Sequence, residues 1–134
     1  MITIFKEKYM SKNFLLQQTP FVVPTTDGKL IEEHVGRITT GENNLSVAHM
    51  VAPPGWSEPH QNPEFDEYTL MVCGRKQIEI NGETVTLKSG ESLLVKKGVR
   101  VQYSNPFEEE AEYWSVCIPA FSPDSVNREN DSSS

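Results

Sequence analysis

Short strand-like runs, punctuated by glycine or proline, dominate residues 45–118 and constrain the fold of this chain more than any other feature. Asn81-Gly82, between two of these runs, is the strongest short signal for a β-hairpin. No segment keeps an apolar period of about 3.6 residues, so we expect at most a short helical turn near residues 6–13. The pattern predicts an antiparallel sandwich or barrel with strands at 45–51, 67–73, 76–80, 84–87, 92–95, 99–103 and 113–118.

The segment from Gly55 to Gly74 concentrates the residues that could build a site. Side chains on a β-strand alternate between faces, so His60 and Asn62 share a face. Glu67 comes from the start of the next strand, after a turn that contains proline. We expect these three side chains to converge inside a small barrel, in a geometry suited to a metal ion or a polar ligand.

This segment resembles the first motif of the cupin family, which reads Gly, about five residues, His-x-His, three or four residues, Glu, six residues, Gly. The gap after Gly55 is one residue short, Asn62 stands where the second histidine is expected, and the spacing from Glu67 to Gly74 fits.

The segment 90–105 resembles the second cupin motif, which reads Gly, five residues, Pro-x-Gly, two residues, His, three residues, Asn. Gly90, Gly98 and Asn105 match, whereas Lys96 replaces the proline and Val101 replaces the histidine. Because the two motifs occur in order, with a hairpin of suitable length between them, the resemblance is strong for the fold; it is weaker for the function, since two of the family's four metal ligands are missing.

The resemblance implies an all-β fold, a cupin-type antiparallel jelly-roll β-barrel. A length of 134 residues fits one domain. We place the barrel at residues 36–121, after an N-terminal extension at 1–35 that cupins often use as an edge strand or pass to a partner subunit. Residues 122–134 are polar and are expected to form a flexible C-terminal tail.

Strand alternation predicts which side chains line the interior. With Glu67 inward, Thr69 and Met71 also face in, and with Val101 at the ligand position, Tyr103 does too. Trp56 precedes the site and is expected near the barrel mouth. The predicted ligand-binding residues are thus Asn62, Thr69, Met71, Val101, Tyr103 and Trp56, a few polar groups on an apolar wall.

His60 and Glu67 are the candidate catalytic residues and the first candidates for metal ligands, since neutral imidazole coordinates metals and a buried carboxylate needs a partner. Asn62 offers only a weaker carbonyl oxygen. These residues do not form the combination of two histidines and one carboxylate that is expected of a non-haem iron site. They therefore predict at most a weakly bound divalent ion. An inward His49 would rebuild such a triad; the alternative is a hydrogen-bonded core histidine.

Composition excludes several classes of partner. The net charge of −7, with 12 basic and 19 acidic residues, disfavours nucleic acids and anionic membranes. No apolar run approaches the roughly 20 residues of a membrane span, and the N-terminus lacks a secretory core. Cys73 and Cys117 are read as buried reduced thiols, so we expect a cytoplasmic protein.

An apolar outer face and the family resemblance together predict a homodimer. Tyr68, Leu70 and Val72 alternate with the inward residues of their strand and therefore face out. Three functions stay open at this stage. The first is binding of a small polar molecule at a degenerate metal site. The second is an enzyme, metal-assisted or using His60 and Glu67 as an acid–base pair in isomerase or epimerase chemistry. The third is a structural or regulatory module with a vestigial site.

Overall fold

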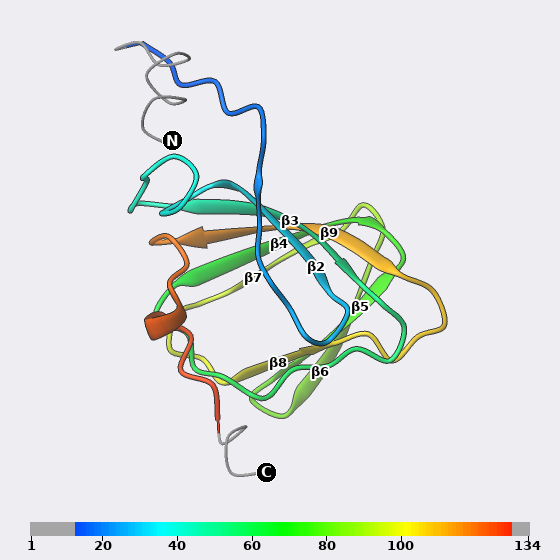
Figure 1. Ribbon diagram of the computed structural model, residues 1–134. Helices are drawn as coiled ribbons and strands as arrows, with labels where there is room; N and C mark the ends of the chain where they lie inside the picture. Colours follow the sequence, from blue (N-terminus) through cyan, green and yellow to red (C-terminus); the bar gives the residue numbers. More distant parts are fainter. Residues whose placement is uncertain (1–12, 130–134) are drawn as a thin grey trace.

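Two antiparallel sheets make up the structure, a computed structural model that describes residues 13–129 (Figure 1). The large sheet has the strand order β1-β2-β3-β9-β4-β7, and the small sheet has the order β6-β5-β8. The strands of the large sheet are β1 (Phe21–Val22), β2 (Leu30–Val35), β3 (Ser46–Ala52), β4 (Asp66–Cys73), β7 (Ser92–Val95) and β9 (Ala111–Ile118). Those of the small sheet are β5 (Arg75–Ile80), β6 (Glu83–Lys88) and β8 (Val101–Ser104).

The all-β prediction is confirmed, and the seven strand-like runs of the sequence correspond to β3 to β9. The run at 99–103 begins later than expected, at Val101, because residues 96–99 close a turn in which the Val99 amide donates to the Lys96 carbonyl. Within residues 13–129, no helix is long and apolar enough to cross a membrane. The expected helical turn at 6–13 lies outside the described residues, Asn13 excepted.

β1 and β2 belong to the N-terminal extension and form the edge of the large sheet. β2 pairs with β3 along most of its length, so residues 21–35 of the extension contribute directly to the fold. Sequence patterning does not identify β2, because Glu32 and Glu33 are adjacent and interrupt any alternation of apolar residues. Glu33 is nevertheless buried, and its carboxylate accepts hydrogen bonds from the backbone amides of Ile38 and Thr39.

Asn105, the last residue of the second motif, holds three segments of backbone together. Its fully buried side-chain amide donates to the carbonyl oxygens of Ala52, Pro53 and Glu109 at 3.1, 3.2 and 2.8 Å. Its side-chain oxygen accepts from the amide of Phe107 at 3.1 Å. Buried carbonyls need partners, so this asparagine satisfies the ends of β3 and the turn before β9.

Gly74, the last residue of the first motif, occupies a position that other residues cannot fill. Its φ is +78°, and a Cβ there would collide with the backbone carbonyl oxygen of Glu110. Gly82, in the β5–β6 hairpin, has a similar φ of +88° but open space around the position of a Cβ. The requirement for glycine at 74 therefore comes from close approach to β9 as well as from backbone conformation.

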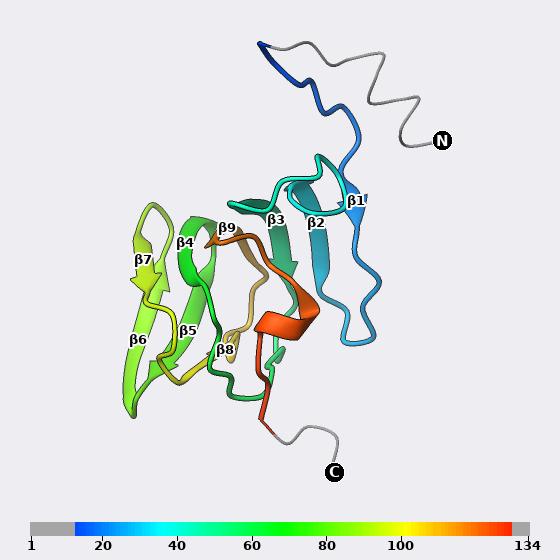
Figure 2. The ribbon, with the colours of Figure 1, turned by 90° about the vertical axis from the view of Figure 1, so that its left-hand side faces the viewer.

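The C-terminal segment folds back across the barrel instead of hanging free. It contains a short 3-10 helix, η1 (Pro123–Ser125), and crosses one side of the space between the sheets (Figure 2). The amides of Asn62 and Glu64 donate to the carbonyls of Asn127 and Ser125 at 3.2 and 2.8 Å. This corrects the expectation of a flexible tail beginning at residue 122, at least as far as residue 129.

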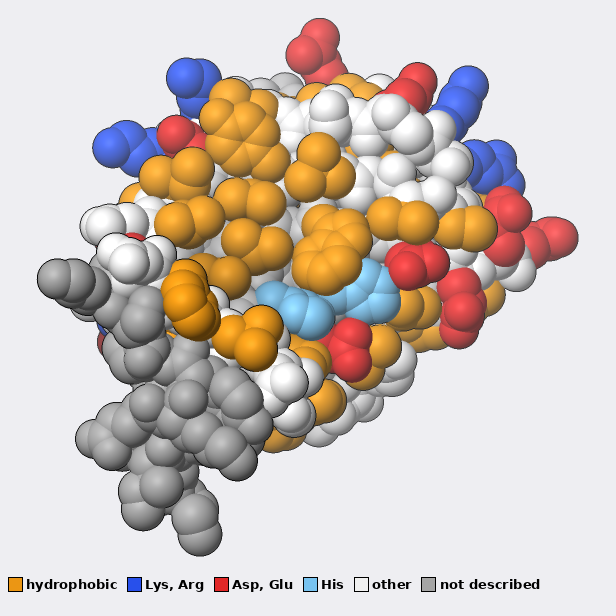
Figure 3. Space-filling model, turned by 90° about the horizontal axis from the view of Figure 1, so that it is seen from above, with side chains coloured by type: hydrophobic (Ala, Val, Ile, Leu, Met, Phe, Trp, Pro, Cys, Tyr) orange, Lys and Arg blue, Asp and Glu red, His pale blue; other side chains and the backbone are white. Residues whose placement is uncertain are grey.

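The outer face of the large sheet is apolar. Tyr68, Leu70 and Val72 are 39%, 43% and 45% exposed, which establishes the alternation expected along β4. Figure 3 shows this hydrophobic surface, with histidine side chains among the apolar ones. Cys73 is also exposed, contrary to expectation, because the pairing of β4 with β9 shifts register between Met71 and Cys73. The homodimer stays a prediction.

Candidate functional site

His60 and Asn62 lie on the outside of the barrel. Nε2 of His60 is 2.8 Å from Oε1 of Glu79, which alternates in β5 with the fully buried Ile78 and so faces outward. The side-chain amide of Asn62 donates to the carbonyl of Gly98 at 3.4 Å in an exposed position. The two residues share a face, as the alternation predicts, but the face is the outer one. The predicted convergence of His60 with Glu67 is therefore wrong.

The short gap after Gly55 explains this reversal. The gap is one residue shorter than in the cupin motif, and a slip of one residue turns every side chain of an extended segment to the opposite face. Gln61 takes the inward position instead: it is 4% exposed and lines an interior cavity. Reciprocal backbone hydrogen bonds of 2.9 Å with Val101 hold Gln61 in this orientation.

Glu67 faces the interior together with the residues that alternate with it in β4. Glu67 borders the cavity, and Thr69 and Met71 are almost fully buried beside it. The Glu67 carboxylate accepts a hydrogen bond of 2.6 Å from the hydroxyl of Ser115 in the adjacent strand β9. Met71 belongs to the packed core, so of these three residues Glu67 is the one placed to meet a ligand.

Val101, Tyr103 and Trp56 are all inside the barrel, with different roles. Val101 is fully buried in the packed core, while Tyr103 also borders the cavity. The indole Nε1 of Trp56 donates to a carboxylate oxygen of Asp27 at 2.8 Å. Trp56 therefore anchors the loop before β2, which forms one wall of the cavity.

His49 faces away from the interior. Its Nδ1 and Nε2 lie 2.9 and 2.8 Å from carboxylate oxygens of Glu32 and Glu112, and its ring packs near Trp114. Neither the triad with His60 nor a core position is realised, because Ser46, Ala48 and Met50 form the inner face of β3. Both faces of β3 carry apolar side chains, so hydrophobicity alone does not reveal which one is buried.

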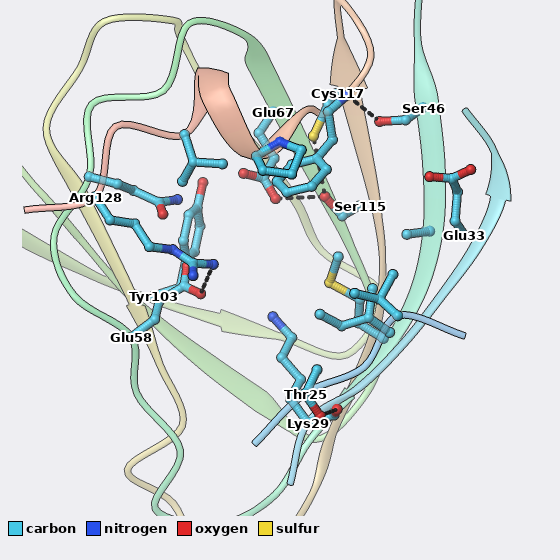
Figure 4. A pocket seen from close by; sticks show the side chains of 18 of the residues that line it. Thr25, Lys29, Glu33, Ser46, Glu58, Glu67, Tyr103, Ser115, Cys117 and Arg128 are labelled. Atoms are coloured by element: carbon cyan, nitrogen blue, oxygen red, sulfur yellow. Dashed lines mark hydrogen bonds and ion pairs between the residues drawn. The ribbon is translucent and has the colours of Figure 1, made fainter. Parts of the chain in front are cut away.

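A cavity of about 510 Å³ lies beside the packed core. Its walls come from the loop before β2, from the inner faces of β3, β4 and β9, from the segment around Glu58, and from the C-terminal segment. Figure 4 shows side chains from these separate parts of the chain around one space. The charged residues among those lining it are Asp27, Lys29, Glu33, Glu58, Glu67, Lys76 and Arg128.

Two buried lysines dominate the cavity. Lys29 and Lys76 are 8% and 1% exposed. Nζ of Lys29 lies 4.1 Å from the ring centroid of Trp56, and Nζ of Lys76 lies 3.7 Å from that of Tyr113 and 4.2 Å from that of Tyr103. The aromatic faces thus offset part of the cost of burying these ammonium groups.

The carboxylates around the lysines set the protonation of the cavity. Burial alone would lower the pKa of Lys29, but Tyr113 and the carboxylates of Glu58 and Glu67 outweigh it, and the pKa is raised. Lys29 therefore stays an ammonium at neutral pH. Burial raises the pKa of Glu58, even though Lys29 and Lys76 lower it, so Glu58 holds a proton more readily than an exposed glutamate.

Tyr103 and Cys117 remain protonated. Burial, followed by the charge of Glu67, raises the pKa of the Tyr103 hydroxyl well above its ordinary value. The same two causes raise the pKa of the Cys117 thiol. Because a thiolate is the reactive form, Cys117 is a packing residue of the cavity wall and not a nucleophile.

The residues at the cupin ligand positions do not fit a metal ion. Val101 offers no donor atom, the Asn62 amide is bonded to the Gly98 carbonyl, and His60 is turned outward. Across residues 13–129, no group of three or more His, Cys, Asp or Glu side chains is arranged to hold a metal.

Several residues of the cavity were missed from the sequence. Lys76 could have been found, because it alternates with Ile78 and Ile80 and so shares their inward face. Lys29 and Arg128 lie outside the motifs, and only the folded chain brings the loop before β2 and the C-terminal segment to the same cavity.

Comparison with known proteins defines the class. A family model described as Cupin domain matches residues 48–118, more than half of the chain, so this chain belongs to the cupin family. Two solved structures share the fold. KdgF from Halomonas sp. has a TM-score of 0.64 at 14% identity, covering 78% of this chain and 89% of that one. A Cupin 2 conserved barrel domain protein from Salinispora arenicola has a TM-score of 0.59 at 18% identity, covering 69% and 77%.

A curated relative is more similar in sequence. The endoribonuclease YbeY of Myxococcus xanthus is 47% identical over 108 residues, which are 81% of this chain and 37% of that protein. This chain thus spans little more than a third of the relative's length. The likeness extends beyond the residues that the family model matches.

Proposed function

We propose that this cupin domain binds a small polar organic molecule in the interior cavity, through its own side chains. The observation that carries the proposal is the clustering of buried charged groups around a hollow space. A cavity of about 510 Å³ is within the usual range for ligand pockets. The volume also weighs against the third possibility, a vestigial barrel filled by side chains.

Energetics support a ligand in this space. Burying an ammonium or a carboxylate costs several kcal/mol unless it is paired. Lys29, Lys76 and Glu67 are nevertheless buried, and all three line the cavity. A set of buried charges of both signs around an open space is an arrangement suited to polar recognition.

A cavity-filling substitution tests the proposal. Ala48 lines the cavity from β3, so Ala48→Phe is expected to block it, while Val47→Phe on the outer face of the same strand is the matched control. Small molecules that copurify, or that raise the melting temperature in a metabolite screen, would be identified by native mass spectrometry. We expect Ala48→Phe to weaken binding at least tenfold and Val47→Phe to leave it unchanged. Equal binding by both variants would refute the proposal.

A second candidate is acid–base catalysis in the same cavity. The placement of His60 removes it from this role, but Glu58 lines the cavity and its carboxyl pKa is raised, as suits a general acid. Deuterium incorporation into carbon positions of sugar acids in heavy water, followed by NMR, would reveal such chemistry. We expect any exchange to disappear in Glu58→Gln, and exchange that persists in this variant would exclude the assignment.

A further inference from the structure

The ammonium groups of Lys29 and Lys76 meet around one aromatic ring. Nζ of Lys29 is 5.3 Å and Nζ of Lys76 is 3.7 Å from the ring centroid of Tyr113. Lys29 comes from the loop before β2, and Lys76 comes from β5 in the opposite sheet. The fold therefore brings two positive charges from distant parts of the chain to the same cavity and the same aromatic ring.

Neither ammonium group has a close anionic partner. Within residues 13–129, the ion pairs within 4.0 Å include neither Lys29 nor Lys76. An ammonium has three N–H donors, and contact with an aromatic face offsets part of the charge without supplying acceptor oxygens for all three donors. An anionic group placed between the two lysines would supply both charge and acceptors.

Gln61, unlike the two lysines, has a side-chain acceptor that lacks a hydrogen-bond donor. Its side-chain oxygen Oε1 is buried and has no hydrogen-bond partner within the described residues, although Gln61 lines the cavity. A buried acceptor without a donor costs about 1–3 kcal/mol. The oxygen itself is enclosed, so a ligand hydroxyl would donate to it after the side-chain amide of Gln61 rotates toward the cavity, whereas a carboxylate has no proton to donate.

The carboxylates of the cavity limit the number of negative charges on the ligand. Glu67 is held by Ser115, and Glu58 forms an ion pair of 3.7 Å with Arg128. Both lie along the cavity wall and would repel a second anionic group, while accepting hydrogen bonds from hydroxyls. The walls therefore favour one anionic end and a hydroxylated body.

We propose that the ligand is a hydroxylated organic acid, with one carboxylate between Lys29 and Lys76 and a hydroxyl donating to Oε1 of Gln61. This inference rests on the proposed small-molecule function and adds the class of molecule. It requires no metal, and the two residues that would bind the carboxylate, Lys29 and Lys76, lie outside the cupin ligand positions.

Matched probes measured by isothermal titration calorimetry test the inference. D-Gluconate and D-galacturonate are the hydroxy acids, D-sorbitol and D-galactose are their uncharged counterparts, and hexanoate is an anion without hydroxyls. The proteins are the wild type, Lys29→Met, Lys76→Met and Gln61→Leu, with Lys88→Met on the exposed side of β6 as the control. Circular dichroism and thermal melting establish that each variant folds.

We expect at least one hydroxy acid to bind at least tenfold more tightly than its uncharged counterpart and than hexanoate. Each cavity lysine variant should weaken that binding by about tenfold to a hundredfold, as loss of a hydrogen bond to a charged group does. Gln61→Leu should weaken the binding of the hydroxy acid and leave the binding of hexanoate unchanged. Lys88→Met should leave the binding of every probe unchanged. If Lys76→Met does not fold, Lys29→Met tests the same prediction, because Lys29 lies in the loop before β2 and not in a strand.

Two results would overturn the inference and are distinguishable. Binding of an uncharged sugar as tight as that of its acid, lost in Ala48→Phe but unaffected in the lysine variants, would refute the ligand class and leave the proposed function standing. Binding of no probe to the folded wild type would count against the inference, and a metabolite screen that also finds no ligand would remove the proposed function with it.

Discussion

The motif residues and the cavity residues of this barrel have different structural roles, apart from Glu67, which belongs to the first motif and also lines the cavity. Gly74 and Asn105, which match the cupin motifs, fix the backbone where strands β4 and β9 and the end of β3 meet. The cavity depends on Lys29 and Lys76, which no motif names. The residues that fix the backbone, here Gly74 and Asn105 and called the frame, can thus match the family while the residues that line the cavity differ from it. Substitutions in the frame should cost stability, and substitutions in the cavity should cost binding.

Gly74→Ala is expected to give the largest effect on the frame. A methyl group at φ +78° would meet the Glu110 carbonyl, so we expect a loss of about 3–5 kcal/mol in the free energy of unfolding. Urea denaturation measures it. Gly82→Ala, at a similar φ but in open space, should lose only about 1–2 kcal/mol. Equal losses would show that close approach to β9 is unimportant.

Asn105→Ala comes next. Removing its side chain leaves three backbone carbonyls and one amide without their hydrogen-bond partners. We therefore expect the free energy of unfolding to fall by about 2–4 kcal/mol. Asn62→Ala, at an exposed position, should change the free energy of unfolding by less than about 0.5 kcal/mol. Thermal and chemical denaturation of both variants would decide whether the second motif asparagine is structural.

Val101→His restores the histidine of the second cupin motif. It tests whether the absence of this one ligand is what prevents metal binding. The side chain lies in a packed apolar core, so an imidazole there should cost about 1–3 kcal/mol. Because His60 and Asn62 face outward, the variant should bind no stoichiometric metal, as measured by mass spectrometry. Val72→His, on the exposed face, controls for the added imidazole. Stoichiometric iron, manganese or zinc in Val101→His alone would mean that the lost ligand was the sole obstacle.

His49 is expected to give the smallest effect, and it lies outside the cavity. Burial lowers its pKa, but Glu112 and Glu32 at its two ring nitrogens outweigh this and raise the pKa. The resulting stabilisation is full below the unfolded pKa of about 6.5 and is lost as pH rises through the higher folded pKa.

His49→Gln should therefore lower the free energy of unfolding by about 1 kcal/mol or less near pH 5.5, and by less near pH 8.5. His34→Gln is a control, since the ring of His34 packs on the same Trp114. Ligand affinity should be unchanged in both variants. The same loss from His49→Gln at both pH values would contradict the assigned ion pairs.

The fold could be read from the sequence because its signals are local. Alternation along β4 and the Asn81-Gly82 turn depend on near neighbours, and the structure has both where they were expected. The site could not be read in the same way. One missing residue after Gly55 reverses the orientation of His60 and Asn62, and that reversal is visible only when the pairing of Gln61 with Val101 is known.

Two walls of the cavity lie outside the stretch that the family model matches, residues 48–118. A protein trimmed to that stretch for expression would keep both glycine-bearing motifs, and sequence searches would still recognise it. It would lack Lys29 and Arg128 and the segments that carry them. The shape and charge of this cavity can therefore change through the flanking sequences alone, and domain boundaries drawn from homology would discard the segments that form those two walls.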